Sequence, residues 1–320
     1  MTPPFIGRDA LAALMNLDDY LVAVTAAFRA HAEGRTSQPM PLHIAVVGGG
    51  FHAKGAFVAL DRSHVAVKVN SNFPGNPLRG LPTIQGAVLL YDAEDGRLLA
   101  ILDSMEITAK RTAAASALAA QHLARRDAAA IAICGCGEQG RAQLAAIAQV
   151  RALRRAYARD ADAQKAEVFA CDMGAALGLE VTATRQLRDA TIASDIVVTA
   201  TSTSTPFLTP ECVRPGTFIA AIGADNPHKS ELDPRLFAGT KVVVDSLEQA
   251  STMGDLHHAI AALGPIDAVE LADVVAGRKP GRTTDAEITI FDSTGLAIQD
   301  VAAATAAYAR FVRRGAPCST

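Results

Sequence analysis

Lys68 stands inside an apolar run, Val65–Val69, that has the alternation of a β-strand. Because successive side chains of a strand point to opposite faces, this lysine can face solvent, and the spacing alone favours that interpretation. A lysine at the edge of a cleft would behave differently, since partial burial lowers its pKa and suits it to bind a carboxylate or move a proton. Lys68 is therefore a candidate catalytic residue, with the solvent-facing position as the alternative.

Arg111 and Asp225 are two further charged residues in positions suited to a cleft. Arg111 opens the Ala-rich helix expected at Ile107–Leu123, the segment that should connect two domains. A guanidinium there can clamp a carboxylate or a pyrophosphate, and an interdomain salt bridge is an equally good interpretation. Asp225 follows the apolar strand Phe218–Ile222, where a carboxylate can serve as general acid or base, with a turn or helix N-cap as the alternative.

A glycine-rich turn, Gly135–Gly140, follows an apolar strand and precedes a helical pattern. This is G-x-G-x-x-G in the strand–turn–helix context of dinucleotide binding. Gly135 allows the tight turn, Gly137 lets the backbone approach a pyrophosphate, and Gly140 lets the helix pack against its strand. The helix N-terminus adds free N–H groups and a positive dipole end. The sequence therefore predicts a Rossmann domain that binds NAD or NADP.

The choice of coenzyme depends on the end of the second Rossmann strand, expected at Arg154–Ala158. NAD-binding sites usually carry an acidic residue there, bonded to the ribose hydroxyls. The strand-end position is Ala158, and the next residue, Arg159, can bind a 2′-phosphate, which favours NADP(H) over NAD(H). If the strand runs longer, Asp160 becomes the ribose acceptor.

Composition excludes several classes of protein. The charge is nearly balanced at −3 and tryptophan is absent, so nothing supports nucleic-acid binding. The start of the chain lacks a signal-peptide pattern and its apolar stretches are shorter than a bilayer span, which predicts a cytoplasmic protein without a membrane partner. The five cysteines lack zinc spacing, so reduced thiols and no metal site are expected.

Hydrophobic periodicity divides the chain into two patterns. An amphipathic helix is expected over Asp9–Gly34, followed over Leu42–Leu102 by short β-branched runs with turn residues between them, which predict a mostly antiparallel sheet. From Asp127 to about Val244, strands and helices alternate, which is typical of a parallel sheet covered on both faces. A last helix is predicted at Ala297–Arg313, and we expect it to return the chain to the first domain.

The predicted fold is therefore α/β, with two domains. Residues 116–296 form a doubly wound parallel Rossmann sheet. Residues 1–115, with 297–320 returning to them, form a second, α+β domain with an antiparallel sheet, for substrate binding and dimerisation.

Several motifs in order make the chain similar to the ornithine cyclodeaminase/μ-crystallin family, from about Lys68 to Val301. The matching stretches are Lys68-Val69, Phe73–Asn76, Gly80–Thr83, Ile107-Thr108, Arg111–Ala114, Gly135–Gln139, Gly223–Asp225 with Pro227, Lys229, Glu231 and Leu232, and Phe291–Ser293 with Gly295, Ala297, Ile298 and Asp300. The resemblance implies a Rossmann domain and a homodimer formed through the other domain.

The resemblance also implies roles for individual residues. Lys68 would contact the substrate carboxylate or imine, Arg111 would bridge substrate and cofactor, and Asp225 would be the acid/base group. Thr201 lies in a threonine-rich run after a strand and can line the nucleotide crevice or cap the turn before Pro206. The cofactor-binding residues expected from the turn and the resemblance together are Thr83, Arg111, Gly135, Gly137, Glu138, Gln139, Gly140, Arg159, Asp160, Thr201, Gly223, Ala224, Asp225, Lys229 and Ser293.

The chain departs from the family pattern upstream of Lys68. The family usually has an arginine after a proline-rich turn to grip the substrate carboxylate, and His43 stands near that position here. His52 and Lys54 are candidates to replace the missing charge, although a histidine on a strand is often only structural. The expected substrate-binding residues are therefore His43, His52, Lys54, Lys68 and Arg111.

The hypothesis that follows is an NAD(P)-dependent enzyme that reduces a small cyclic or open imino acid, such as Δ1-pyrroline-2-carboxylate, or oxidises the matching amino acid. Lys68 and Arg111 would hold the carboxylate of a substrate bound between the domains, and Asp225 would control the proton on nitrogen. One alternative is an ornithine or lysine cyclodeaminase that recycles its NAD and releases ammonia. The other is a non-catalytic, crystallin-like binder of NADPH and small ligands.

Overall fold

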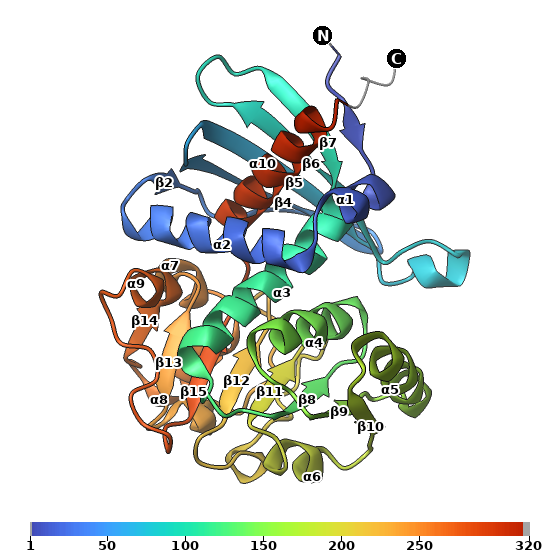
Figure 1. The fold of residues 1–320 in the computed structure, drawn as a ribbon. Coiled ribbons are helices and arrows are strands. Elements are labelled where there is room, and N and C mark those ends of the chain that lie inside the picture. The colour runs from blue at the N-terminus through green and yellow to red at the C-terminus, as the bar shows by residue number, and fades with distance from the viewer. Residues whose placement is uncertain (1, 316–320) are drawn as a thin grey trace. The chain divides into compact units, whose positions relative to one another are not determined.

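The computed structural model describes residues 2–315, which form two compact units, residues 2–114 with 296–315, and residues 115–295 (Figure 1). The chain passes from the first unit to the second within helix α3 (Ser104–Leu123) and returns just before helix α10 (Ala297–Arg313). The first unit contains a mixed, mostly antiparallel sheet and the second a parallel sheet. The predicted α/β fold class is confirmed.

The first unit is built on a seven-stranded sheet with the neighbour order β1-β7-β6-β5-β4-β2, and β3 pairs with β4. Only the pair of β1 and β7 is parallel. The strands are β1 (Phe5–Ile6), β2 (Thr36–Ser37), β3 (Leu42–Val46), β4 (Gly49–Ala59), β5 (Ser63–Asn72), β6 (Ile84–Asp92) and β7 (Leu98–Asp103), with a short 3-10 helix, η1 (Asn76–Arg79), between β5 and β6.

The two faces of this sheet have different surroundings. Helix α10 packs on β4, β5 and β6, and its partner α2 (Leu17–Ala32) packs on α10. The residues on this inner face form the core of the unit: Ala56, Val58, Ala66, Val88, Leu90, Ala100 and Leu102. The outer face, which we define by Leu42, Ile44, Val46, Phe51 and Val69, is apolar and exposed.

The first helical segment consists of two helices, α1 (Arg8–Leu14) and α2, so the single helix expected over Asp9–Gly34 is wrong. Asn16 caps α2, because its side chain accepts from the Asp19 N–H and the Asp19 carboxylate accepts from the Asn16 N–H. The two helices meet at an angle of 87°. A cap residue does not disturb the hydrophobic pattern on either side of it, which is why periodicity alone hid the break.

The second unit contains an eight-stranded sheet in the order β10-β9-β8-β11-β12-β15-β13-β14, with parallel pairs throughout. Its strands are β8 (Ala130–Cys134), β9 (Arg155–Arg159), β10 (Glu180–Ala183), β11 (Ile196–Thr199), β12 (Phe218–Ala221), β13 (Lys241–Val244), β14 (Ala268–Glu270) and β15 (Thr289–Asp292). Its helices are α4 (Glu138–Val150), α5 (Ala163–Leu177), α6 (Leu187–Ile192), α7 (Leu247–Ala250), α8 (Asp255–Leu263) and α9 (Leu271–Val275), with 3-10 turns η2 (Pro210–Cys212) and η3 (Pro234–Phe237). The strand order reverses between β8 and β11, and such switch points border the ligand crevice in open α/β sheets.

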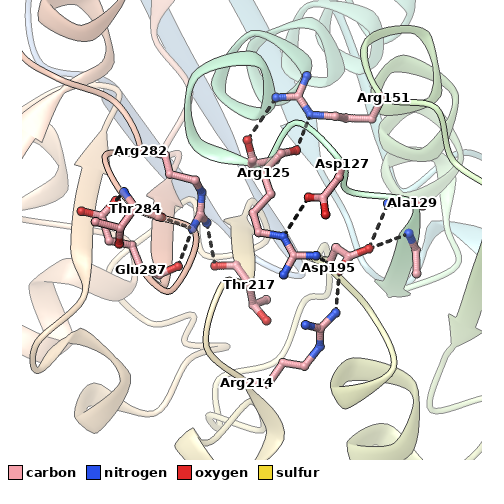
Figure 2. Close-up of polar contacts among 12 residues, drawn as sticks. Arg125, Asp127, Ala129, Arg151, Asp195, Arg214, Thr217, Arg282, Thr284 and Glu287 are labelled. Atoms are coloured by element: carbon pink, nitrogen blue, oxygen red, sulfur yellow. Dashed lines mark hydrogen bonds and ion pairs between the residues drawn. The ribbon is translucent and has the colours of Figure 1, made fainter.

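A polar network closes the amino-terminal edge of the parallel sheet (Figure 2). Asp195 precedes β11 and accepts the N–H groups of Ala129 and Ala130 at 2.9 and 3.0 Å, next to the start of β8. Arg125 and Arg214 donate to its other oxygen at 2.9 and 2.5 Å. In open α/β sheets, ligands bind outside the carboxyl ends of the strands, so this network lies at the edge opposite to the one expected to bind ligands.

Among residues 2–315, no single helix has both the length and the hydropathy needed to span a membrane; α1 and α2 reach that threshold only when counted together across their bend. Cys134, Cys136, Cys171 and Cys212 are free thiols, whereas Cys318 lies outside the described residues.

Candidate active site

Lys68 lies on the inner face of β5 and is only 5% exposed, so the solvent-facing interpretation is wrong. Alternation along a strand defines two faces but does not say which one packs against a helix. Here the ammonium is accommodated because Asp300 of α10 meets it, with Nζ 3.0 Å from Oδ1 and 2.8 Å from Oδ2. The Thr108 hydroxyl lies 3.2 Å from the same Nζ.

Arg111 shares that carboxylate. Its Nε donates to Asp300 Oδ1 at 2.9 Å and its Nη1 donates to Gln299 Oε1 at 2.7 Å. Helix α3 begins at Ser104, so Arg111 lies in its third turn and does not open the helix as expected. Arg111 therefore forms a salt bridge with Asp300 inside the first unit, and not the interdomain salt bridge offered as its alternative role.

The Lys68–Asp300–Arg111 cluster is fully buried, which controls its ionisation. Burial and the Arg111 charge lower the pKa of Lys68 to about 7, against the opposing effect of Asp300. Burial alone would raise the pKa of Asp300, but Arg111 and Lys68 lower it. One carboxylate thus faces two cations, and the protonated cluster carries an excess positive charge. An anionic group such as a substrate carboxylate would balance that charge.

The other predicted substrate-binding residues lie on the same face of the same sheet. Lys54 stands opposite Lys68 in the β4–β5 register, and its charge also lowers the pKa of Lys68. His52 is two residues along β4 and therefore shares this face. Its ring lies 4.4 Å, between centroids, from that of His43, its partner on β3. The structure thus brings a row of basic side chains together next to the buried cluster.

The glycine turn of the second unit has the geometry that its sequence predicts. Gly135 has φ of 107°, and a Cβ there would lie 2.5 Å from the Ala200 carbonyl oxygen. A Cβ on Gly140 would lie 2.1 Å from the Gly135 carbonyl oxygen. By contrast, a Cβ on Gly137 would meet nothing within 4 Å. Since Gly137 is the N-cap of α4 and has no capping side chain, the open space and the N–H groups of the first turn, which begins with Glu138 and Gln139, fit a pyrophosphate.

Strand β9 ends at Arg159, one residue later than predicted, so the strand-end assignment to Ala158 is wrong. Asp160 now follows the strand directly, and its Oδ2 accepts the Cys136 N–H of the glycine turn at 2.8 Å. The Arg159 guanidinium lies over the Phe207 ring, 5.8 Å from its centroid. A cavity next to the turn is lined by Cys136, Arg141, Asp162, Gln164, Lys165 and Val168.

Loops after β11 and β12 hold further predicted cofactor residues. Thr201 donates to Glu231 Oε1 through its N–H at 2.6 Å and its hydroxyl at 2.7 Å. The same hydroxyl accepts the Thr203 N–H at 3.4 Å, so Thr201 also has the turn-capping role offered as its alternative. The Gly223 N–H donates to Glu231 Oε2 at 2.8 Å, and Ala224 beyond it is buried.

Asp225 lies at the same edge with a side chain that is 57% exposed and 2.8 Å from Lys229 Nζ. In the same turn, the side-chain oxygen of Asn226 accepts the N–H groups of His228 and Lys229. Ser293 is buried and donates to Asp245.

Thr83 precedes β6 in the first unit, and its carbonyl accepts the Phe73 N–H. Lys68, Arg111 and Thr83 therefore belong to one unit, and Asp225, Lys229, Ser293 and the glycine turn to the other.

Sequence reasoning gave no role to Asp300 and Glu231, although both are buried and bind predicted site residues. A local signal was available for Asp300 only, because Glu231 stands among polar residues, Lys229, Ser230 and Asp233. Asp300 lies on the apolar stripe of α10 between Ala297 and Ala304, at helical spacing. A carboxylate in such a stripe must find a buried partner.

Solved structures of three proteins resemble this fold closely. An archaeal alanine dehydrogenase dimer with bound NAD has a TM-score of 0.93 and 34% identity, covering 99% of this chain and 98% of its own. The Thermococcus litoralis Δ1-pyrroline-2-carboxylate reductase in complex with NADH and L-proline has a TM-score of 0.94 and 33% identity, covering 99% and 100%. A lysine cyclodeaminase that recognises L-lysine, L-ornithine and L-2,4-diaminobutyric acid has a TM-score of 0.85 and 30% identity, covering 99% and 94%.

The family model described as ornithine cyclodeaminase/mu-crystallin matches residues 6–315, nearly the whole chain. The motifs that suggested this resemblance are therefore parts of one continuous match. The chain belongs to the ornithine cyclodeaminase/mu-crystallin family.

Proposed function

We propose that this protein is a dinucleotide-dependent oxidoreductase that reduces a small imino acid at its α-carbon, or oxidises the matching amino acid. The observation that carries the proposal is the buried Lys68–Asp300–Arg111 cluster, whose excess positive charge suits a carboxylate. Two of the similar structures, the alanine dehydrogenase and the Δ1-pyrroline-2-carboxylate reductase, are named for reactions of small amino or imino acids.

In the proposed mechanism, Lys68 and Arg111 hold the substrate carboxylate and orient the α-carbon. Asp300 keeps both cations in place through the contacts already described. His52 and Lys54 lie on the same sheet face. They form one side of the substrate site and help to exclude other substrates. Asp225 exchanges the proton on the substrate nitrogen as a general acid or base. The bound nicotinamide would supply or accept the hydride.

We propose NAD(H) as the preferred coenzyme, in place of the NADP(H) that Arg159 suggested. Asp160 directly follows β9 and lies against the glycine turn, where an acidic side chain can bind ribose hydroxyls. A 2′-phosphate at that position would face this carboxylate. Arg159, the residue that would have to bind the phosphate, is stacked over Phe207.

Replacing Asp160 by serine is expected to weaken the preference for NADH over NADPH by at least about tenfold, because one charge repulsion against the 2′-phosphate is removed. The ratio of kcat/KM for the two coenzymes measures the change. Asp189→Ser is the matched control, because Asp189 is an exposed carboxylate of the same unit, in the first turn of α6. An unchanged ratio in Asp160→Ser would contradict the assignment.

Glycine substitutions in the turn test the dinucleotide site itself. Gly137→Ala is expected to leave the thermal unfolding temperature nearly unchanged, because the new methyl group meets nothing within 4 Å, yet to weaken NADH binding about tenfold or more by occupying the space proposed for the pyrophosphate. Gly140→Ala should instead destabilise the second unit, because its Cβ would lie 2.1 Å from a carbonyl oxygen. Calorimetry and NADH fluorescence titration separate the two effects, and equal NADH affinity in Gly137→Ala and wild type would argue against the site.

We also propose a homodimer that buries the outer face of the first unit's sheet. Leu42, Ile44, Val46, Phe51 and Val69 form a continuous apolar surface there, and a contiguous exposed patch of this kind usually marks an association surface. The archaeal alanine dehydrogenase is described as a dimer.

A substrate panel tests the reaction. Purified protein with NADH or NADPH is offered pyruvate with ammonia or methylamine, Δ1-pyrroline-2-carboxylate and Δ1-piperideine-2-carboxylate, and with NAD+ is offered ornithine and lysine. Consumption of reduced coenzyme by an imino acid supports the proposal. Ammonia release from ornithine or lysine without net NADH would instead identify a cyclodeaminase, and tight coenzyme binding without turnover of any substrate would identify a binding protein.

A further inference from the structure

Glu231 is a fully buried carboxylate that the proposed mechanism does not use. It accepts three hydrogen bonds, from the N–H of Thr201 at 2.6 Å, the hydroxyl of Thr201 at 2.7 Å and the N–H of Gly223 at 2.8 Å. A Cβ on Gly223 would lie 2.5 Å from the Glu231 carboxyl carbon, so the backbone there is in direct contact with the carboxylate. Glu231 therefore fastens two loops to each other.

These loops follow β11 and β12, which are neighbours in the parallel sheet (Figure 1). The loop with Thr201 also touches the glycine turn, because a Cβ on Gly135 would lie 2.5 Å from Ala200 O and 3.2 Å from Thr201 Cγ2. Both loops thus border the edge proposed for the dinucleotide, at the carboxyl ends of the strands.

We propose that Glu231 is a positioning residue for the dinucleotide: its ionised carboxylate holds the Thr201 and Gly223 loops in the binding conformation, and its protonation releases them. The inference rests on the proposed function, because it places the dinucleotide at this edge. All three donors need acceptor oxygens, and a protonated carboxyl group has fewer acceptor positions and carries a proton that the backbone N–H groups of Thr201 and Gly223 cannot accept.

The surroundings of Glu231 set its ionisation near neutrality. Burial and then the charge of Asp255 raise the pKa of Glu231 to about 7, and the hydrogen bonds from Thr201 oppose that rise. Asp255 faces it from α8 and accepts the N–H of Glu231 itself at 2.8 Å. From β8, Cys134 faces the same carboxylate as a neutral thiol, because burial raises the pKa of Cys134 to about 12.

NADH fluorescence titration between pH 6 and pH 8 tests this positioning role. If only the ionised form binds, the Kd for NADH should be about tenfold higher at pH 6 than at pH 8 in the wild type. Glu231→Gln, which has the same shape but cannot ionise, should bind weakly at both pH values and lose the dependence. Thr201→Val removes a contact that lowers the pKa of Glu231, so its loss of affinity should begin at a higher pH.

Asp195→Asn is the matched control, since Asp195 is a buried carboxylate at the opposite edge of the same sheet. This variant should keep the wild-type ratio between the Kd values for NADH at pH 6 and at pH 8, even if it lowers the stability of the protein. A wild-type affinity that does not change with pH, or a Glu231→Gln variant with the wild-type ratio, would overturn the inference. If Glu231→Gln does not fold, an unshifted profile in Thr201→Val overturns it. Failure of the wild type to bind either coenzyme at any pH rejects the proposed function itself, and the inference with it.

Discussion

Replacing Lys68 by methionine is expected to reduce kcat/KM for imino-acid reduction by about a thousandfold, because the substrate carboxylate loses a buried, charge-assisted partner worth roughly 4 kcal/mol. NADH affinity should stay within about twofold of the wild type, since the glycine turn belongs to the other unit. Steady-state kinetics and NADH titration on the same preparation measure both quantities.

The protonation of Lys68 gives this prediction a second readout. The pKa of Lys68 is lowered to about 7, so the ammonium form that binds an anion is lost as the pH rises through that value. The wild-type kcat/KM for the imino acid should therefore fall on the alkaline side. Lys68→Arg keeps its charge throughout, so it should recover part of the activity and lose the alkaline limb. Lys68→Met with near wild-type turnover would reject the assignment of this residue to the substrate.

Asp300→Ala is expected to destabilise the first unit by about 3–5 kcal/mol, because it leaves Lys68 and Arg111 as buried cations without their shared carboxylate. Lys68 should respond by losing its proton more readily, since Asp300 is the group that holds its pKa up. Activity should fall with stability, because neither cation keeps its position. Differential scanning calorimetry and kinetics follow the two effects.

Arg310→Gln is the matched control on the same helix. Arg310 pairs with Asp19 of α2, but its side chain is 38% exposed, so its removal should cost less than about 1 kcal/mol. Equal losses of stability in Asp300→Ala and Arg310→Gln would show that α10 is sensitive to the loss of any ion pair. The buried position of Asp300 would then have no special role.

Much of the second unit was predictable because its signals are local. The glycine turn lies between a buried strand and a helix that its own residues specify, and the alternation of strands and helices identified the parallel sheet. The error at the end of β9 was a single residue, but it moved Asp160 into the position next to the strand. Strand ends carry little hydrophobic signal, so coenzyme preference is a fragile inference from sequence.

In the first unit, the burial of Lys68 could not be predicted from local sequence patterns. Lys68 looks like the polar residue of an alternating strand, and only its partner reveals that it faces inward. That partner, Asp300, is separated from it by 232 positions in the sequence. Periodicity describes a strand or a helix by itself, whereas the decision between a solvated and a buried lysine depends on what another element brings to it.

Alternating residues of strand β5 have two different roles. Lys68 points to the buried cluster, while Val67 and Val69 on either side point to the outer face. A strand has a repeat of two residues, so inserting or deleting one residue before Lys68 would exchange these roles. The lysine would then enter the apolar outer surface, and a valine would stand against Asp300. Within β5, a substitution is therefore expected to be tolerated more easily than an insertion or a deletion.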